Sequence, residues 1–486
     1  MAKITKQSDN FSKWYTDVIL DADLADYGPV KGTMVVKPYG FSLWTNIRDS
    51  LNKMIEDSGH DNAYFPLFIP KSFLEKEAKH VEGFAKECAV VTHSKLISEE
   101  GSLTVDPESK LEEEIIVRPT SETIIWHMFK KWITSYRDLP LKVNQWANVV
   151  RWEMRTRLFL RTSEFLWQEG HTAHATKEEA MKETLEIVEI YRTLFEDYLA
   201  IPTIIGRKSN LERFAGADET FSIETMMRDK KALQAGTSHY LGTNFGSAFD
   251  VKFQSKDNKE HPVYATSWGV STRMVGALIM VHGDDKGLKI PPKIAPTQVV
   301  IVPINPKKEK SEEFSSFVMK VEEKLIHLDI RTHIDDLDES PGFKFNKWEL
   351  KGVPIRIEIG LKEFENMEVT VCRRDNSEKY QIQIDKIDEI PTILQSIQDN
   401  LFNDAKTFMD NNTCTVSSFA DFTDTLSKNN QFIKAYWDGT DETELKIKEK
   451  TKATIRCIVE DNEDSSNKCI FSGETAKHLV VFAKAY

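Results

Sequence analysis

The sequence predicts three domains, each of which combines helices with strands. We expect an α+β domain with an antiparallel sheet over residues 1–281, an α/β domain over 282–400 and a small α/β domain over 401–486. Three observations support this division. The 486 residues suffice for about three domains of ordinary size, helical and alternating strand patterns mix in the first part, and strands alternate with helices after it.

The first domain carries both kinds of periodicity. Residues 41–59 and 177–200 show the spacing of amphipathic helices, whereas 65–70 and 115–119 read as strands. Only about 60 residues separate His174 from Gln234, and they are predicted to form one helix and a short strand, with no room for an inserted domain.

The stretch 148–174 predicts an antiparallel hairpin with a charged cleft. Residues 148–153 read as a strand on which Arg151 and Glu153 share a face, and the arginine-rich residues 154–158 turn the chain back. In the second strand, period two places four residues on one face: Phe165, Trp167, Glu169 and His171. The alternative is an ordinary hairpin whose arginines and glutamates pair across a solvated surface.

After the first domain, residues 283–296 are rich in Gly, Pro and Lys and are predicted to be a linker. Strands are expected at 297–304 and 331–336, a helix at 311–330, and a helix followed by a strand at 342–360. This alternation predicts a parallel or mixed sheet with crossover helices. The region from 401 onward is dense in charge, and it is predicted to be a smaller appendage.

Composition narrows the class of protein. No apolar run approaches the roughly 20 residues of a membrane span, and the first residues lack the apolar core of a secretory signal, so we expect a cytoplasmic enzyme without a membrane partner. The five cysteines are scattered and odd in number, which favours free thiols. The net charge of −13 opposes RNA binding unless basic patches are local.

Residues 151–174, RWEMRTRLFLRTSEFLWQEGHTAH, resemble motif 2 of class II aminoacyl-tRNA synthetases, and FLRTSEFLWQEGHTAH resembles the prolyl-tRNA synthetase family in particular. The resemblance covers nearly the whole chain. Residues 62–93 are similar to motif 1, with Pro66 as its proline, and VRPTSET at 117–123 is similar to the amino-acid-binding loop. Residues 234–250 and 267–287 resemble the ATP-site strand and motif 3.

The resemblance implies a class II synthetase fold for the first domain and an anticodon-binding function for the second. The third domain resembles that of the archaeal and eukaryotic-like form, which lacks the inserted editing domain. Many relatives of this form carry a four-cysteine zinc site in this domain. The matching positions here are Asp438, Thr443, Cys469 and Ser472. One thiolate, one carboxylate and two hydroxyls make a poor zinc site, so we expect no structural zinc.

The implied activity is ATP-dependent attachment of L-proline to tRNA(Pro) in two steps through a prolyl-adenylate, with Mg²⁺, in a homodimer. The reaction joins two anions, so the site must cancel charge, and fixed guanidiniums grip phosphate or carboxylate bidentately. By resemblance, Arg151 bridges the α-phosphate and the proline carboxylate, and Arg273 holds the far end of ATP. These two are the predicted catalytic residues, and no protein nucleophile is needed.

The resemblance also implies the remaining contacts. The ATP-binding residues are Arg151, Glu153, Thr162, Gln234, Thr237, Ser271 and Arg273. Proline offers a compact ring, a secondary ammonium and a carboxylate, so its site needs an aromatic slot and acceptors for the cation. The expected proline-binding residues are Thr120, Glu122, Arg151, Phe165, Trp167, Glu169, His171, Phe214 and His239.

Two other functions stay open at this point. A sister class II synthetase for threonine, histidine or glycine shares the motifs, although a threonine enzyme is expected to use zinc ligands in its pocket. A catalytically inactive paralogue would use the fold as an RNA-binding or regulatory module, but the motif residues are intact.

In the second domain Arg356 and Glu358 alternate on one strand face, where a donor and an acceptor can read bases. The family commonly continues with an Arg-Asp pair, whereas this chain reads GLKEFEN.

Overall fold

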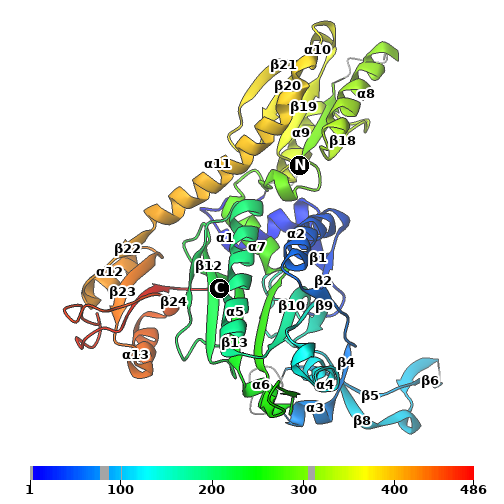
Figure 1. The fold of residues 1–486 in the computed structure, drawn as a ribbon. Coiled ribbons are helices and arrows are strands. Elements are labelled where there is room, and N and C mark those ends of the chain that lie inside the picture. Colours follow the sequence, from blue (N-terminus) through cyan, green and yellow to red (C-terminus); the bar gives the residue numbers. More distant parts are fainter. Residues whose placement is uncertain (1–3, 77–86, 100, 305–311) are drawn as a thin grey trace.

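A computed structural model describes residues 4–76, 87–99, 101–304 and 312–486. Residues 77–86, which belong to the segment that resembles motif 1, lie outside the described residues. Figure 1 shows the first domain as the central body, the second domain at one end of it and the third domain on one side. The long helix α11 (Ile390–Asn411) runs between the second and third domains.

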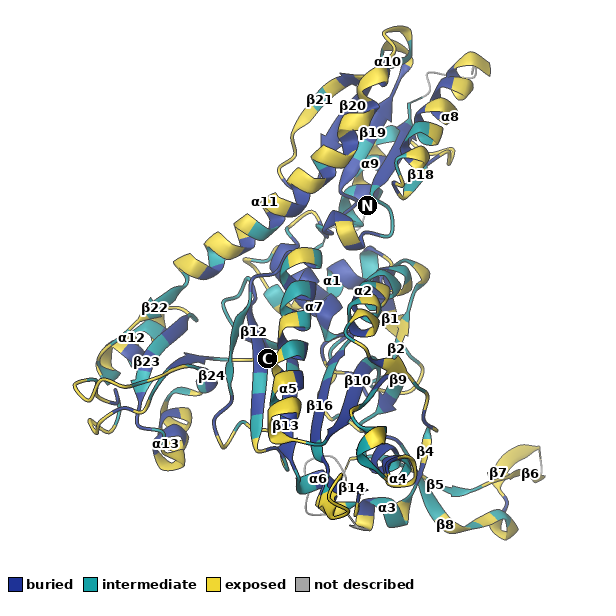
Figure 2. Ribbon diagram, in the orientation of Figure 1, coloured by how far each residue is buried: buried dark blue, intermediate teal, exposed yellow. Residues whose placement is uncertain are grey.

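The first domain is built on an antiparallel sheet, as predicted. Its described strands follow the order β11-β12-β13-β16-β10-β9-β3, and only the short β3 pairs in the parallel sense. The bounds are β3 (Asp61–Asn62), β9 (Leu141–Val150), β10 (Glu164–His174), β11 (Ile204–Arg207), β12 (Glu219–Met226), β13 (Ala232–Gly242) and β16 (Tyr264–Ser271). Figure 2 shows that the middle of this sheet is buried.

Helices enclose the sheet. They are α1 (Phe11–Asp21), α2 (Pro38–Asp57), α3 (Lys71–Lys76), α4 (Glu122–Trp132), α5 (Lys177–Thr193), α6 (Asn244–Ala248) and α7 (Arg273–His282). Helix α5 begins with a capping box in which Thr176 and Glu179 satisfy each other's backbone donors, and it packs on β12, β13 and β16. Helix α7 is buried from Met274 to His282 and is mostly apolar there, as expected for a helix at the centre of a core.

The helices predicted at 41–59 and 177–200 correspond to α2 and α5, and a π-helical turn (Leu194–Tyr198) continues α5. Between His174 and Gln234 the structure holds only α5, this turn, β11, β12 and the start of β13. No inserted domain interrupts this stretch, all of which is described.

The first domain also contains short strands that form separate two- and three-stranded sheets outside the main sheet. Their bounds are β1 (Ala25–Tyr27), β2 (Met34–Val36), β4 (Phe68–Pro70), β5 (Ala89–His93), β6 (Leu96–Glu99), β7 (Ser102–Val105), β8 (Lys110–Val117), β14 (Lys252–Gln254) and β15 (Glu260–Pro262). Strands β5 to β8 form an arm that projects from the body, and Figure 2 shows its tip exposed.

The second domain contains the predicted mixed sheet. Strand β17 pairs in parallel with its neighbours β18 and β19, whereas β19, β20 and β21 are antiparallel. The elements are β17 (Val299–Pro303), α8 (Glu312–His327), β18 (Thr332–Ile334), α9 (Pro341–Leu350), β19 (Ile355–Ile359), α10 (Leu361–Glu365), β20 (Glu368–Arg373) and β21 (Lys379–Gln383). The predicted linker is not free, because Leu288, Ile290 and Ile294 are buried in the core of the first domain.

The third domain continues the sheet of the first domain instead of standing apart as an appendage. Its strands follow the order β22-β23-β25-β24, and β24 pairs with β11 where Arg207 faces Ile458. The elements are β22 (Thr413–Thr415), α12 (Phe419–Lys428), β23 (Phe432–Trp437), α13 (Asp441–Thr451), β24 (Thr454–Asp461) and β25 (His478–Ala483). The predicted boundary at residue 400 falls inside helix α11.

Helix α11 is also fixed at its middle. The amide of Gln398 donates from Nε2 to the carbonyls of Asp197 and Tyr198, at 3.0 and 3.1 Å, and its Oε1 accepts from the Lys293 amide. The helix is therefore attached to the first domain as well as to the other two.

All five cysteines are described and none is in a disulfide, in agreement with the predicted free thiols. In the described parts of the chain, no helix combines the length and the apolar character that crossing a membrane requires.

Candidate active site

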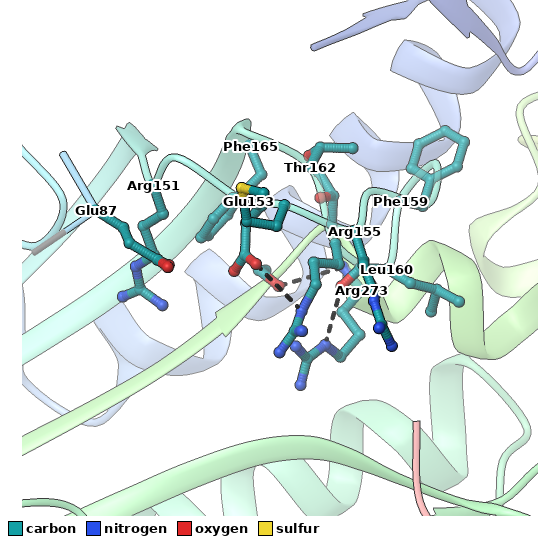
Figure 3. A pocket seen from close by; sticks show the side chains of 13 residues that line it. Glu87, Arg151, Glu153, Arg155, Phe159, Leu160, Thr162, Phe165 and Arg273 are labelled. Atoms are coloured by element: carbon teal, nitrogen blue, oxygen red, sulfur yellow. Dashed lines mark hydrogen bonds and ion pairs between the residues drawn. The ribbon is translucent and has the colours of Figure 1, made fainter. Parts of the chain in front are cut away.

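A two-part cleft lies at the loop end of the β9–β10 hairpin and extends along one face of β10. Its larger compartment has a volume of about 450 Å³ and its smaller compartment about 320 Å³. The two compartments share Arg151, Phe165, Ser271 and Arg273. Figure 3 shows the larger compartment, with Arg151 and Glu87 on one side of Glu153 in this view and Arg155 and Arg273 on the other. The arginines of the larger part are suited to an anion, and the size of the smaller part is suited to a small molecule.

The hairpin is antiparallel as predicted, with Val150 opposite Glu164. The four residues predicted to share a face of β10, Phe165, Trp167, Glu169 and His171, all line the smaller compartment. On the opposite face Gln168 accepts a hydrogen bond from the Tyr191 hydroxyl at 2.6 Å, and Gly170 lies against the ring of Trp268. A Cβ at Gly170 would lie 2.1 Å from that ring, so only glycine fits there.

The prediction that Arg151 and Glu153 continue the first strand is wrong. Strand β9 ends at Val150. The Arg151 amide still donates to the carbonyl of Ser163, its neighbour in the hairpin register, at 2.8 Å, but the Trp152 amide turns away and donates to the Glu87 carbonyl at 2.9 Å. Arg151 and Glu153 nevertheless both line the larger compartment.

Arg151 lies where the compartments meet. Its Nε donates to the Pro119 carbonyl at 3.0 Å, and its guanidinium lies 5.5 Å from the ring centre of Phe165 and 5.3 Å from that of Trp167. Burial lowers the pKa of Arg151 to about 10, with the neighbouring Arg273 acting in the same direction and Glu122 opposing it. The group therefore keeps its charge at neutral pH while it is largely stripped of water.

Arg273 is the first residue of α7, directly after β16 ends at Ser271. Its Nε donates to the Leu160 carbonyl and its Nη1 to the Gln234 carbonyl, both at 3.4 Å. Burial, together with the charge of Arg161, lowers the pKa of Arg273. Neither contact uses a carboxylate, so its positive charge remains available to a bound anion.

The far end of the smaller compartment is acidic. Glu169 accepts hydrogen bonds from Gln145 at 2.8 Å and from His171 at 3.2 Å. Burial alone raises the pKa of Glu169, but the hydrogen bond and charge of His171 outweigh it, so the pKa is lowered. For His171, burial is outweighed by Glu169 and Glu122, and the pKa is raised. Glu122 itself accepts from the Thr120 hydroxyl. These carboxylates can hold a cationic group of a ligand.

An aromatic wall closes the other side. The rings of Phe214 and His239 lie 4.6 Å apart, and those of Phe165 and Trp167 meet edge to face at 6.1 Å. Burial, with the charge of His171, lowers the pKa of His239 to about 3, and its Nδ1 is hydrogen-bonded to the Thr220 hydroxyl at 2.9 Å. His239 is therefore neutral at physiological pH and supplies an aromatic surface.

All of the predicted site residues line one compartment or the other. Glu153 and Thr162 lie in the larger one only. Residues lining the smaller one are Thr120, Glu122, Arg151, Phe165, Trp167, Glu169, His171, Phe214, Gln234, Thr237, His239, Ser271 and Arg273. Thr162 donates its hydroxyl to the Glu164 carbonyl at 2.7 Å, and Glu153 lies 3.6 Å from Arg161.

Several lining residues were not predicted. They are Glu87, Arg155 and Arg161 in the larger compartment and Lys208, Glu212, Thr220 and Ser267 in the smaller one. The run of arginines at 155–161 was a visible signal for two of them. Lys208 and Glu212 had none, because they follow a short strand and reach the cleft only through tertiary packing.

Three of the four positions that resemble zinc ligands in the third domain, Asp438, Thr443 and Ser472, form a hydrogen-bonded cluster together with Thr440. The Asp438 carboxylate accepts hydroxyl hydrogen bonds from Thr440 and Thr443, both at 2.8 Å, and from Ser472 at 2.6 Å. Burial raises the pKa of Asp438, but these donors outweigh it and the pKa is lowered. The cluster joins the start of α13 to the loop before β25.

In the second domain, Arg356 and Glu358 lie on one face of β19 as predicted, and they bond to each other at 3.0 Å. The Arg356 guanidinium also stacks on Phe345, 4.3 Å from the ring centre. A hollow of about 190 Å³ beside them is lined by the basic residues Lys286, Arg356, Arg373, Arg374 and Lys379.

Comparisons with known proteins agree with this arrangement. Residues 104–282 match the model of the tRNA synthetase class II core domain (G, H, P, S and T), 298–393 match the anticodon binding domain, and 419–486 match the C-terminal domain of prolyl-tRNA synthetase. A proline–tRNA ligase of Flavobacterium johnsoniae is 54% identical over 99% of both chains, and one of Cytophaga hutchinsonii is 53% identical over 100% of both.

A solved structure is similar over the same length. The prolyl-tRNA synthetase of Cryptosporidium parvum, in complex with halofuginone and AMPPNP, superposes with a TM-score of 0.92 at 38% identity. The match covers 99% of this chain and 96% of that one, so it includes all three domains and the cleft.

Proposed function

This chain belongs to the proline–tRNA ligase family of class II aminoacyl-tRNA synthetases and charges tRNA with proline, and we propose that Arg151 and Arg273 carry its chemistry. The observation behind this proposal is that both guanidiniums line both compartments of the cleft. They are therefore placed to act on two anions at once, the carboxylate of the amino acid and the phosphates of ATP. An inactive paralogue is not favoured.

We propose that L-proline occupies the smaller compartment. Its ring lies among Phe165, Trp167, Phe214 and His239, and its secondary ammonium faces the carboxylates of Glu122 and Glu169, with the Thr120 hydroxyl nearby. The ionised Glu169, held by Gln145 and His171, supports this assignment. A cation beside aromatic faces and carboxylates gains from both interactions. The proline carboxylate then points toward Arg151.

ATP is proposed to occupy the larger compartment and the strand ends beside it. Arg151, Arg273, Glu153, Thr162, Gln234, Thr237 and Ser271 supply the contacts. In the first step a proline carboxylate oxygen attacks the α-phosphorus, the bond to the β-phosphate oxygen breaks, and pyrophosphate leaves. The two guanidiniums stabilise the added negative charge on the phosphorus, and the rest of the site positions the reactants. In the second step a ribose hydroxyl of the terminal adenosine of tRNA(Pro) attacks the prolyl carbonyl, the bond to the adenylate phosphate breaks, and AMP leaves.

We propose that ATP binds as its Mg²⁺ complex. Glu87 and Glu153 are the carboxylates that line the larger compartment, and Mg²⁺ on a nucleotide needs only one or two protein carboxylates.

We also propose that the third domain folds without zinc, because Asp438 and three hydroxyls occupy the region of the zinc-like positions. Elemental analysis of protein purified without chelator tests this, and tightly held stoichiometric zinc would contradict it.

We propose that the chain works in the cytoplasm as a homodimer and binds the anticodon of tRNA(Pro) through its second domain. The basic hollow beside Arg356 supports contact with RNA, because clustered Lys and Arg attract phosphates even on an acidic protein. The arm formed by β5 to β8 supports dimerisation, since it presents apolar side chains that are about half exposed or more, among them Leu96, Leu103 and Val105.

The decisive experiment is ATP–pyrophosphate exchange with Arg151→Ala. We expect a loss of more than about a hundredfold, because a charge-assisted contact to the reacting phosphate is removed, while the fold is retained. The control is Arg192→Ala, which removes a half-exposed arginine that pairs with Glu189 on α5. Exchange that depends on threonine, histidine or glycine in place of proline, or near-normal exchange by Arg151→Ala, would refute the assignment.

A further inference from the structure

The segment 207–212 connects the smaller compartment to the third domain. It begins at the last residue of β11, two of its residues, Lys208 and Glu212, line the compartment, and Phe214 lies two positions beyond its end. We call it the wall segment. Because a loop is held only by its own contacts, the partners of the wall segment decide how firmly this side of the compartment is placed.

Those partners belong to the third domain. The Ser209 hydroxyl donates to Glu444 at 2.8 Å, and the Glu212 carboxylate lies 3.1 Å from the Lys448 ammonium. Further contacts of the same kind are Arg207 with Asp461 at 3.0 Å and Asn210 with Asp441 at 3.5 Å. Polar side chains therefore reach across to α13 and β24 from nearly every position of the wall segment.

A buried charge cluster lies beneath these contacts. The Lys208 ammonium is 2.8 Å from the Glu224 carboxylate, and it also donates to the Arg456 carbonyl at 2.7 Å. The Arg456 guanidinium is 3.0 Å from the same carboxylate. All three residues are buried, and Glu224 on β12 lies opposite Gln234 on β13. Removing one member of such a cluster leaves an uncompensated buried charge, so its geometry is tightly specified.

We propose that the third domain positions the proline pocket: Glu444, Lys448 and Arg456 hold the wall segment so that Lys208, Glu212 and Phe214 close the smaller compartment. These three are positioning residues, since none of them lines the cleft itself. The inference rests on the proposal that proline occupies this compartment. It explains how a domain attached at the far edge of the sheet contributes to amino-acid binding.

The proposal predicts an effect on proline binding that is separate from ATP binding. The contacts of the wall segment lie on the proline side, whereas the larger compartment is lined by other residues. Loosening the wall segment should therefore raise the KM for proline and leave the KM for ATP and the kcat of exchange nearly unchanged. Such a split would not arise from a general loss of folded protein, which lowers the apparent kcat alone.

The test compares two lysines of α13 that are equally exposed. Lys448→Ala removes the contact with Glu212, and we expect the KM for proline to rise by up to about fivefold, the usual limit for an exposed ion pair. Lys446→Ala is the matched control, because Lys446 pairs with Glu442 of its own helix, and it should leave the KM unchanged. Equal effects from the two substitutions would overturn the proposal.

A second pair of variants probes the buried contact without disturbing the charge cluster. Ser209→Ala removes the hydroxyl that bonds Glu444 and should raise the KM for proline by about tenfold, whereas Ser209→Thr keeps a hydroxyl and should restore it. Thermal unfolding of each variant verifies the fold. An unchanged proline KM in both Lys448→Ala and Ser209→Ala refutes the inference. A wild-type protein without proline-dependent exchange would instead refute the proposed function.

Discussion

Single residues determine which charges the cleft can hold. The pKa of His171 is raised and that of His239 is lowered to about 3, so of two buried histidines in one compartment only the first can carry a charge near neutrality. Burial disfavours a charge on both rings, but for His171 the hydrogen bond to Glu169 and the charges of Glu122 and Glu169 outweigh it, whereas the charge of His171 adds to the effect of burial on His239. Because His171 forms its hydrogen bond with Glu169, the Glu122 carboxylate remains as an acceptor for the cation of a ligand.

Gly170 is the residue whose size is most constrained in the hairpin. Gly170→Ala should lower the free energy of unfolding by about 1–3 kcal/mol, because the new Cβ would overlap the Trp268 ring and neither strand can move. Thermal unfolding measures this effect. Gly342→Ala is the control, since a Cβ there meets nothing within 4 Å. Equal melting temperatures of the two variants would contradict the steric argument.

Glu444 should make stability depend on pH. Burial, with the charges of Glu212 and Asp441, raises its pKa from 4.5 to about 7 despite the hydrogen bond from Ser209. Between about pH 4.5 and 7 the folded chain therefore keeps a proton on Glu444 that the unfolded chain has released. The contribution of this residue to stability consequently falls as pH rises through that range.

Glu444→Gln removes that proton equilibrium. We expect the melting temperature of the variant, relative to that of the wild type, to increase as pH rises from 4.5 to 8. Glu449→Gln, at an exposed position on the same helix, should show no such trend. Parallel melting curves for wild type and Glu444→Gln across this range would show that the carboxyl titrates normally.

At the scale of elements, the Asp438 cluster holds the start of α13 to the loop before β25. Asp438→Ala should destabilise the protein by about 1–3 kcal/mol, because the hydroxyls of Thr443 and Ser472 lose a buried acceptor. Denaturant unfolding measures the loss. Asp424→Ala provides the comparison, since Asp424 is exposed on α12 and pairs with Lys428. A loss no larger than that of the comparison would mean that the cluster contributes little.

Period-two spacing predicted the pocket face of β10 correctly, because that strand is regular over its whole length. It failed beyond Arg151, because the Trp152 amide leaves the hairpin to bond the Glu87 carbonyl, a partner that a local pattern cannot reveal. The pairing of β11 with β24 was not predicted either. It joins Arg207 to Ile458, and no local signal links residues so far apart in sequence. Family resemblance identified the cleft residues, but it did not reveal the wall segment.

For the whole molecule, the arm is the clearest sign of a partner. Leu96, Leu103 and Val105 lie on one face of the β6–β7 ribbon, where Leu96 is opposite Val105, and Leu103 is 72% exposed. An isolated two-stranded ribbon is only marginally stable in water, and apolar side chains on it favour association. We therefore expect the arm to be covered by a second copy of the chain.

Light scattering tests this expectation. The wild type should show twice the 55.8 kDa mass of the chain, and the double variant Leu96→Asp, Leu103→Asp should shift toward the single mass. Leu445→Asp, at an exposed leucine of α13, should remain dimeric. A wild type that is monomeric at micromolar concentration, or a double variant that dimerises as well as the wild type, would show that the arm is not the interface.

Helix α11 has a mechanical consequence for a bound tRNA. Its 22 residues span about 33 Å and end in the sheet that β24 joins to β11. Gln398 attaches the middle of the helix to the first domain. The anticodon-binding domain therefore cannot swing on a flexible tether: any tilt of it must bend this rod or carry the third domain along. With the anticodon bound to the second domain as proposed, this helix limits how far the anticodon can move relative to the site of amino-acid transfer.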